Sequence, residues 1–504
     1  MMKRILLSAL GVTLSFSTFA QNEIDALRNS TENLHGTARY RALSGAFGAL
    51  GGDLSAMSIN PAGSAVFSSG ALGLSLGNIN TKNNATFFGK GISEENSDFD
   101  AEQLGGVFVF ADPDEYVNKF SFGVNYQKTS DFEDNILRFG GRNNKHSVVD
   151  YFGEHAKGFR VGDLKTKAGE SISDAYRDLG TNGSFSLQQA FLGYQAYLIE
   201  DEKNGNGDNE TSYLSNAKIP VDQLFSQETM GRNYKLSFNF GLSLNSKFYL
   251  GMNLNSHNIK YRKDTRLIER NFEVGSNVKE VDFRNSLLTT GGGFSFQLGG
   301  IYREKDLRVG VAYQSPTWYR LEDETTQFLA SSVDDSGTIK THVIAPDVVN
   351  LYEEYKFRAP GQWTLSLAYI IGKRALLSAD YQYKDYTAMR YSASYLQSEN
   401  ERIKNLFTGA SSFRFGTEFK ATPALSFRAG TSYEQSPYKD KKMTGNLTGY
   451  SLGMGYDFGG ISLDFAYNTA KRSSEYQMYE IGLVDRAQVD TRWNSYMFTV
   501  LFKL

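Results

Sequence analysis

The sequence predicts an all-β protein, a transmembrane antiparallel β-barrel of about 14 strands. Three observations indicate this fold. Apolar and polar residues alternate with period two from about residue 71 onward, and the connections between these segments are alternately short and long. No apolar run long enough for a membrane-spanning helix follows residue 20. The 504 residues include 49 Gly, 30 Tyr and 36 Phe but only 8 Pro, a composition that favours strands over helices.

Residues 1–20 are predicted to be a cleaved signal peptide. Lys3 and Arg4 precede an apolar run, and the small residue Ala20 suits a cleavage site, so the mature chain would start at Gln21. A transmembrane anchor is the alternative, for which the apolar run is short. The chain has no Cys, which excludes a lipoprotein anchor, disulfides and thiolate metal sites.

The predicted strands have one apolar face and one polar face. In "NLTGYSLGMGYDFGG" (446–460), large apolar side chains alternate with Ser, Gly and Asp. Elsewhere the polar face carries charges such as Arg414, Glu418 and Arg428. An apolar, aromatic outer face and a polar inner face are typical of a barrel with a wet lumen, and a soluble β-protein is the alternative.

The connections predict the strand count. Six short joins fall at 112–118, 245–247, 303–306, 372–374, 421–424 and 459–460. Longer polar joins lie between them, at 263–282, 329–356, 392–408 and 471–491. Short periplasmic turns and long outer loops are typical of outer-membrane barrels, and six short turns imply seven strand pairs. The last strand runs to the chain end at Leu504, where many such barrels end on an aromatic residue.

Composition and motifs argue against several functions. Without Lys3 and Arg4, 51 basic residues face 56 acidic ones, a net charge of −5 that gives no support to nucleic-acid binding. None of the five His residues has a partner at metal-site spacing, and no Gly-x-Ser-x-Gly motif appears. A hydrolase triad is recognised by geometry and so stays open. We expect no enzyme, no metal and no cofactor.

A long extracellular insert is predicted at about 140–232. Within it, "FSLQQAFLGYQAYLI" (185–199) changes from period two to the spacing of an amphipathic helix. We interpret its apolar face and a second apolar patch as a groove for a hydrophobic ligand, and packing of the insert onto the barrel rim is the alternative. The groove residues are Leu187, Phe191, Tyr194, Leu198, Leu224 and Phe225.

The stretch "GTARYRALSGAFGALGGDLSAMSINPAGSAVF" (36–67), between the signal peptide and the strands, resembles the FadL/TodX family of outer-membrane transporters, in the form found in Bacteroidetes. The resemblance implies that residues 21–68 fold inside the lumen as a hatch and that residues 69–504 form the barrel. The Asn-Pro-Ala motif of the family matches Asn60, Pro61 and Ala62, and Asp53 and Ser55 match upstream positions.

Small residues suit the hatch for its place in the lumen. Gly45, Gly48, Gly51 and Gly52 allow close approach to the strand backbones. Pro61 fixes its own φ and keeps the preceding Asn out of the helical region, so that the Asn side chain can bond the local backbone and end the hatch in a turn.

The resemblance implies a monomeric transporter in the outer membrane of a Gram-negative bacterium, in contact with membrane lipids and lipopolysaccharide. Hydrophobic small molecules of the long-chain fatty acid type would bind the surface groove, move to a pocket against the hatch, and leave sideways through the barrel wall after a hatch movement. The third strand (119–132) is the expected exit. The alternative is a haem-binding or other surface receptor, for which His35 in the hatch is the candidate haem ligand. An energised receptor with a 22-stranded barrel would need a longer chain.

Overall fold

The computed structural model describes residues 21–132, 135–202 and 206–504. The predicted signal peptide lies outside these residues. A single antiparallel sheet closes on itself where the first strand pairs with the last, from Ala71 opposite Lys503 upward. The barrel has 14 strands, as the sequence predicts.

Four of the barrel strands are each formed by two consecutive segments. The strands are β1 (Ala71–Phe87), β2 (Lys90–Ala111), β3 (Val117–Asp131) with β4 (Asn135–Asn143), β7 (Val221–Met230) with β8 (Arg232–Leu244), β9 (Phe248–Arg270), β10 (Val278–Glu304), β11 (Leu307–Gln314) with β12 (Thr317–Asp335), β15 (Tyr355–Ala359) with β16 (Gln362–Ile371), β17 (Ala375–Asp385), β19 (Gly409–Lys420), β20 (Leu425–Glu434), β21 (Leu447–Asp457), β22 (Ile461–Gln477) and β23 (Arg486–Lys503).

All six predicted short turns are confirmed, because each joins two neighbouring strands at one end of the barrel. The predicted long joins are partly wrong. Residues 263–282 are mostly strand, since β9 ends at Arg270 and β10 begins at Val278, and β22 and β23 likewise extend into 471–491. On these segments the outer face is polar, with Arg266 and Arg270, and the apolar residues Leu267, Val281 and Val489 face inward and are buried. The expected apolar outer face is therefore missing.

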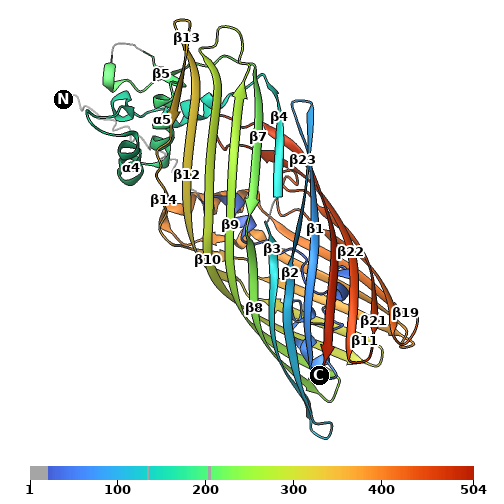
Figure 1. Ribbon diagram of the computed structural model, residues 1–504. Helices are drawn as coiled ribbons and strands as arrows, with labels where there is room; N and C mark the ends of the chain where they lie inside the picture. The colour runs from blue at the N-terminus through green and yellow to red at the C-terminus, as the bar shows by residue number, and fades with distance from the viewer. Residues whose placement is uncertain (1–20, 133–134, 203–205) are drawn as a thin grey trace, which may run out of the picture.

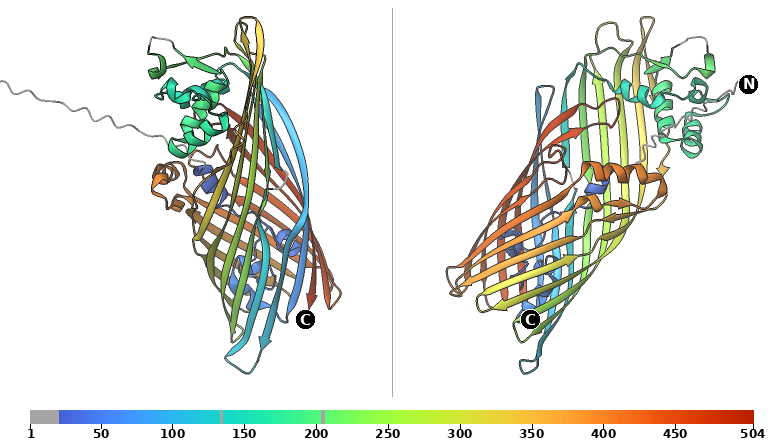
Figure 2. Two further views of the ribbon diagram at one scale, coloured as in Figure 1. Left: turned by 60° about the vertical axis from the view of Figure 1, so that its left-hand side comes forward. Right: turned by 180° about the vertical axis from the view of Figure 1, so that it is seen from behind.

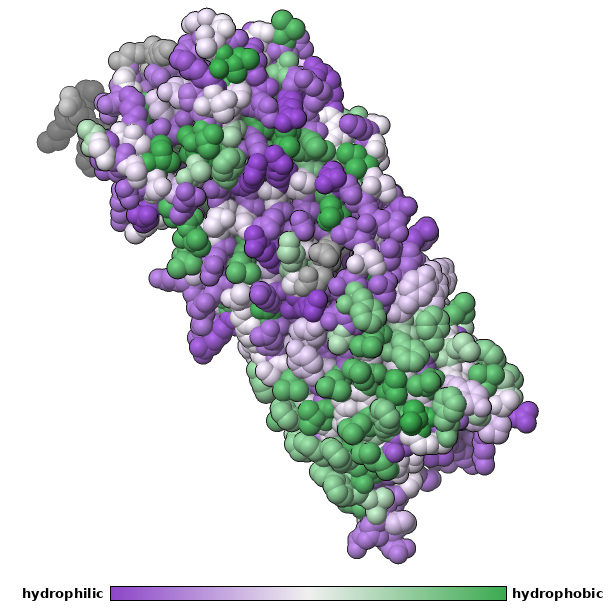
Figure 3. All heavy atoms as spheres, viewed as in Figure 1, coloured by the Kyte–Doolittle hydropathy of each residue, from purple (hydrophilic) through white to green (hydrophobic). Residues whose placement is uncertain are grey.

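The barrel wall is much taller on one side than on the other (Figure 1). β10 has 27 residues and β9 has 23, whereas β16 and β20 have 10 each. Figure 3 shows hydrophobic residues gathered over the lower part of the barrel and polar residues above. Outward-facing Phe240, Leu250 and Leu298 belong to this lower band, while Arg266 lies above it on β9. The lower band is therefore the membrane-facing part, and the tall wall extends beyond it.

The insert packs against the tall wall as a cap of three helices, α3 (Val148–Ala156), α4 (Ile172–Asn182) and α5 (Phe185–Gln195). The structure confirms the helix predicted at 185–199, which ends at Gln195. The insert is shorter than the predicted 140–232, because β4 ends at Asn143 and β7 begins at Val221. The cap and the inner face of the tall wall share one hydrophobic core that includes Phe283.

Smaller elements complete the loops, and α6 (Gln397–Leu406) lies above the short wall (Figure 2). They are β5 (Ile199–Asp201), β6 (Tyr213–Ser215), β13 (Thr338–Ile344), β14 (Asn350–Leu351) and β18 (Arg390–Tyr391), with the 3₁₀ turns η3 (Val161–Leu164), η4 (Gly207–Asn209), η5 (Tyr386–Ala388) and η6 (Ser394–Leu396). Among the described residues, no helix combines the length and the apolarity that crossing a bilayer requires.

Residues 21–70, which precede β1, lie inside the barrel (Figure 2). They form α1 (Glu23–Arg28), α2 (Ala38–Ala42), η1 (Ala56–Ser58) and η2 (Pro61–Val66). α2 contacts β21, β22 and β23, and η2 contacts β8, β9 and β10 on the opposite wall. The segment therefore crosses the lumen from wall to wall, and we keep the name hatch for residues 21–68.

Candidate functional site

The Asn-Pro-Ala turn is seated directly on the barrel wall. Asn60 is buried, and its Oδ1 accepts a hydrogen bond from the Ala62 amide at 3.1 Å. Its Nδ2 donates to the Gly48 carbonyl at 2.7 Å and to the Gly300 carbonyl of β10 at 3.1 Å. Pro61 occupies the first position of η2, where its missing N–H is not needed. The motif therefore joins two parts of the hatch to the wall.

Glycines of the wall make room for this turn. A Cβ on Gly299 would lie 2.0 Å from the Asn60 Oδ1, and a Cβ on Gly251 would lie 2.3 Å from the Ala62 nitrogen. Real Cβ atoms do not approach other atoms this closely. The hatch can therefore pack closely on the wall because these wall positions have no side chain. The residue pattern alone did not reveal this feature.

Asp53 and Ser55 hold the start of α2. The Thr37 hydroxyl, which caps α2, donates to Asp53 at 2.8 Å, and the Thr37 amide donates to the Ser55 hydroxyl at 2.7 Å. Ser55 in turn donates to Gln103 of β2 at 2.6 Å. Both predicted residues therefore stabilise the start of α2, and Ser55 also bonds the hatch to β2.

The predicted hatch glycines serve two purposes. Gly45, Gly51 and Gly52 have positive φ angles of 81°, 62° and 65°, which favour glycine. Gly48 lies against the wall instead, since a Cβ there would meet the Ser366 hydroxyl at 2.1 Å. Its amide donates to Asp380 of β17 at 3.0 Å.

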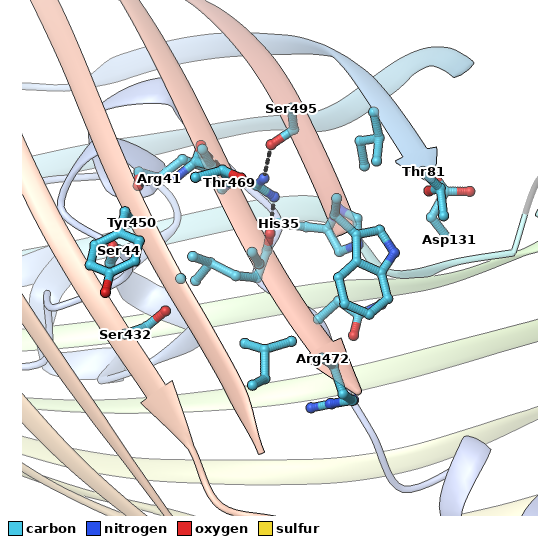
Figure 4. A pocket seen from close by; sticks show the side chains of 18 of the residues that line it. His35, Arg41, Ser44, Thr81, Asp131, Ser432, Tyr450, Thr469, Arg472 and Ser495 are labelled. Atoms are coloured by element: carbon cyan, nitrogen blue, oxygen red, sulfur yellow. Dashed lines mark hydrogen bonds between the residues drawn. The ribbon is translucent and has the colours of Figure 1, made fainter. Parts of the chain in front are cut away.

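A cavity of about 170 Å³ lies in the lumen between the hatch and the wall strands, and Figure 4 shows side chains that line it. Part of its lining is apolar, from Leu34, Ile79 and Trp493. The rest is strongly polar and includes Arg41, whose guanidinium donates to the Leu34 carbonyl and to Ser495. The cavity can therefore contact an apolar group and a polar group at the same time.

Two arginines of the lining share one carboxylate. Arg414 of β19 and Arg472 of β22 lie 3.6 Å and 3.8 Å from Glu434. Within the part of the chain that the structure describes, the buried Nε atoms of both arginines lack a hydrogen-bond acceptor. Buried donors without partners cost free energy, so this corner favours an additional anionic group.

The cavity also reaches an interruption in the wall, which we call the seam. The hydrogen-bonded ladder between β2 and β3 runs from Ala111–Lys119 up to Gln103–Gln127 and stops there. Above this point β3 continues on β8, and β4 pairs with β7. Among the described residues no ladder joins β2 to β4, and Asp98 of β2 and Asp131 of β3 line the cavity from either side.

The structure brings five of the six predicted groove residues together. Phe191, Leu198 and Phe225 are fully buried in the cap core, and Leu187 and Tyr194 pack against it partly exposed. Leu224 is 39% exposed on the opposite face of β7. It cannot join the others because neighbouring residues of a strand point to opposite faces.

His35, the candidate haem ligand, is buried in the hatch with its Nδ1 2.5 Å from the Glu102 carboxylate. Among the described residues, no group of three or more His, Asp or Glu side chains is arranged to hold a metal ion.

Sequence reasoning noted Arg414 only as an inward charge and passed over Arg472. Their alternating inward positions were the available signal.

Comparison with known proteins identifies the family. Residues 228–503 match the family model described as outer membrane protein transport protein (OMPP1/FadL/TodX). The fold is similar to a Pseudomonas aeruginosa FadL homologue, with 12% identity, TM-score 0.54, and 94% of this chain and 99% of that chain covered. It is also similar to the Pseudomonas putida toluene transporter TodX, with 14% identity, TM-score 0.50, and 94% and 100% covered. No curated protein matches the sequence. The chain belongs to the OMPP1/FadL/TodX family of outer membrane transport proteins, which are channels for hydrophobic compounds and not enzymes.

Proposed function

We propose that this protein carries long-chain fatty acid-like molecules, amphiphiles with an anionic head and an apolar tail, passively across the outer membrane. The observation that supports this choice is the pair Arg414 and Arg472, which share Glu434 and keep free Nε donors beside the cavity. An arginine pairs well with a carboxylate because its donors match the two oxygens. A hydrocarbon such as toluene has no group for these donors.

The tail would lie against the apolar part of the same cavity, around Ile79 and Trp493. The cap core supplies a place of first contact, since Leu187 and Tyr194 remain partly exposed at its edge. From the cavity, a shift of the hatch would free the ligand to leave sideways through the seam. This route suits an apolar tail, because the tail gains by passing from a polar lumen into lipid.

The alternative is a haem-binding or other surface receptor that does not transport fatty acids. His35 offers little to haem iron, because its Nδ1 already pairs with Glu102 and the ring is buried. We further propose a monomer of the Bacteroidetes type in a Gram-negative outer membrane, exported by a cleaved signal peptide and surrounded by lipids and lipopolysaccharide.

A binding experiment tests the ligand class. A fluorescent C18 fatty acid should bind the purified wild-type protein, and Arg414→Met and Arg472→Met should each weaken binding by about ten- to a hundredfold, since a charge-assisted hydrogen bond contributes about 1.5–3 kcal/mol. Arg320→Met is the matched control, because Arg320 is exposed and lies 3.6 Å from Glu354, away from the cavity. Equal affinity in wild type and both cavity variants would contradict the proposal.

A further inference from the structure

We propose that the Lys128 ammonium group holds the seam between β2 and β3 closed through its ion pairs, and that His35 connects this ion-pair cluster to the hatch. The inference rests on the lateral exit proposed above and names what controls it. Where the backbone ladder stops, side chains must hold the wall closed. The side chains at this point are charged, buried and bonded to both strands and to the hatch.

Two β-bulges aim these side chains inward. The register of β1 on β2 shifts at Ser75–Leu76, so that the consecutive residues Glu102 and Gln103 are both buried. On β3 the pairing with β8 shifts between Lys128 and Ser130. A bulge redirects a side chain and ends regular pairing, and both bulges lie where β2 and β3 separate.

Lys128 is fully buried among four carboxylates. Its Nζ lies 2.7 Å from Asp131 on β3, and 3.0, 3.4 and 3.8 Å from Asp100, Glu102 and Asp98 on β2. Arg232 of β8 also lies 3.2 Å from Asp100, but within the described residues Lys128 is the cation that contacts carboxylates on both sides of the seam. Without it the carboxylates would repel one another across the gap, because opposing like charges in a poorly solvated site interact strongly.

The hatch is bonded to the same cluster. His35 contacts Glu102 from the luminal side, and the Gln127 side chain donates to the His35 carbonyl at 2.7 Å. Further along, the Asn33 amide donates to the Thr129 carbonyl at 2.8 Å. A movement of this part of the hatch must therefore break contacts with β2 and β3, the two strands that border the seam.

The test measures the width of the seam directly. Because the chain has no native Cys, Ser97→Cys on β2 and Asn135→Cys on β4 can carry nitroxide labels, and electron paramagnetic resonance reports their separation. Lys128→Met should lengthen this separation. Lys82→Met is the matched control, since it removes an exposed Lys that pairs with Glu95 at 3.6 Å on the neighbouring hairpin.

Neutralising the carboxylates shows whether the Lys128→Met variant opens the seam through charge repulsion or through lost packing. Adding Asp98→Asn, Asp100→Asn and Asp131→Asn to Lys128→Met should restore the wild-type separation. An unchanged separation in Lys128→Met, an equal change in Lys82→Met, or no recovery after neutralisation would each overturn the proposal.

A second variant and a binding measurement complete the test. If Lys128→Met fails to fold, as judged by the loss of its heat-modifiable band in gels, Lys128→Gln receives the same test, because it keeps hydrogen-bond donors but removes the charge. Binding of the C18 fatty acid is measured separately on unlabelled protein, because Ser97 and Asn135 line the cavity. Lack of binding by the wild type would count against the proposed ligand, whereas the seam width would still decide the role of Lys128.

Discussion

Replacing Asn60 by Ala should release the hatch while leaving the barrel intact. The substitution removes three short hydrogen bonds of the buried Asn60 side chain, to the Gly48 carbonyl, the Gly300 carbonyl and the Ala62 amide, at 2.7, 3.1 and 3.1 Å, and a longer one to the Val311 carbonyl at 3.4 Å. At about 1 kcal/mol for each of the three short bonds, the hatch loses about 3 kcal/mol of its attachment to the wall, which corresponds to a roughly hundredfold rise in local opening. The barrel ladders do not depend on these bonds.

Hydrogen exchange followed by mass spectrometry measures this opening. Amides within residues 45–66 should exchange roughly a hundredfold faster in Asn60→Ala, while the strands keep their protection and the protein keeps its heat-modifiable band. Asn78→Ala is the control, because it removes an exposed hydrogen bond to Ser97 on the barrel. Unchanged exchange of the hatch in Asn60→Ala would refute the claim that this turn anchors it.

Three further predictions follow from contacts and burial. Gly299→Ala should displace the hatch and raise ion conductance in planar bilayers, because its Cβ would lie 2.0 Å from the Asn60 Oδ1. Gly300→Ala should leave the conductance unchanged, because the nearest atom to its Cβ would lie 3.7 Å away. Equal conductance in both variants would contradict the close contact between Gly299 and the hatch. Phe191→Ala should destabilise the cap by about 3 kcal/mol and speed its proteolysis; wild-type resistance would show that α5 does not depend on the core. Burial lowers the pKa of His155 in α3 from 6.5 to about 4, so the unfolded cap binds the proton more tightly than the folded cap. The free energy of unfolding of the cap is therefore highest above pH 6.5 and falls by about 2 kcal/mol at pH 5. Proteolysis at pH 5 and 7.5 measures this fall, which His155→Phe should abolish.

The membrane-facing half of the barrel could be predicted from the sequence because each strand there must be apolar outside and polar inside. The same rule fails above the membrane, where β9 and β10 meet water on the outer face, and their upper ends therefore resembled loops. Leu224 and Phe225 were grouped by composition, although adjacent residues of a strand point apart.

The site could be predicted only in its local part. The bond from the Ala62 amide to Asn60 follows from the short range of an Asn-Pro turn, and the structure contains it. The contact of Asn60 with Gly300 joins positions 240 residues apart, and no local pattern indicates it. The same holds for Arg414 and Arg472, whose shared carboxylate becomes visible only once β19, β20 and β22 are placed in the wall.

Native mass spectrometry of the purified wild-type protein tests the proposed function most directly. We expect one bound fatty acid or similar anionic amphiphile per chain, and its loss in Arg414→Met and Arg472→Met. Bound haem, or a neutral hydrocarbon retained equally by wild type and both variants, would contradict it.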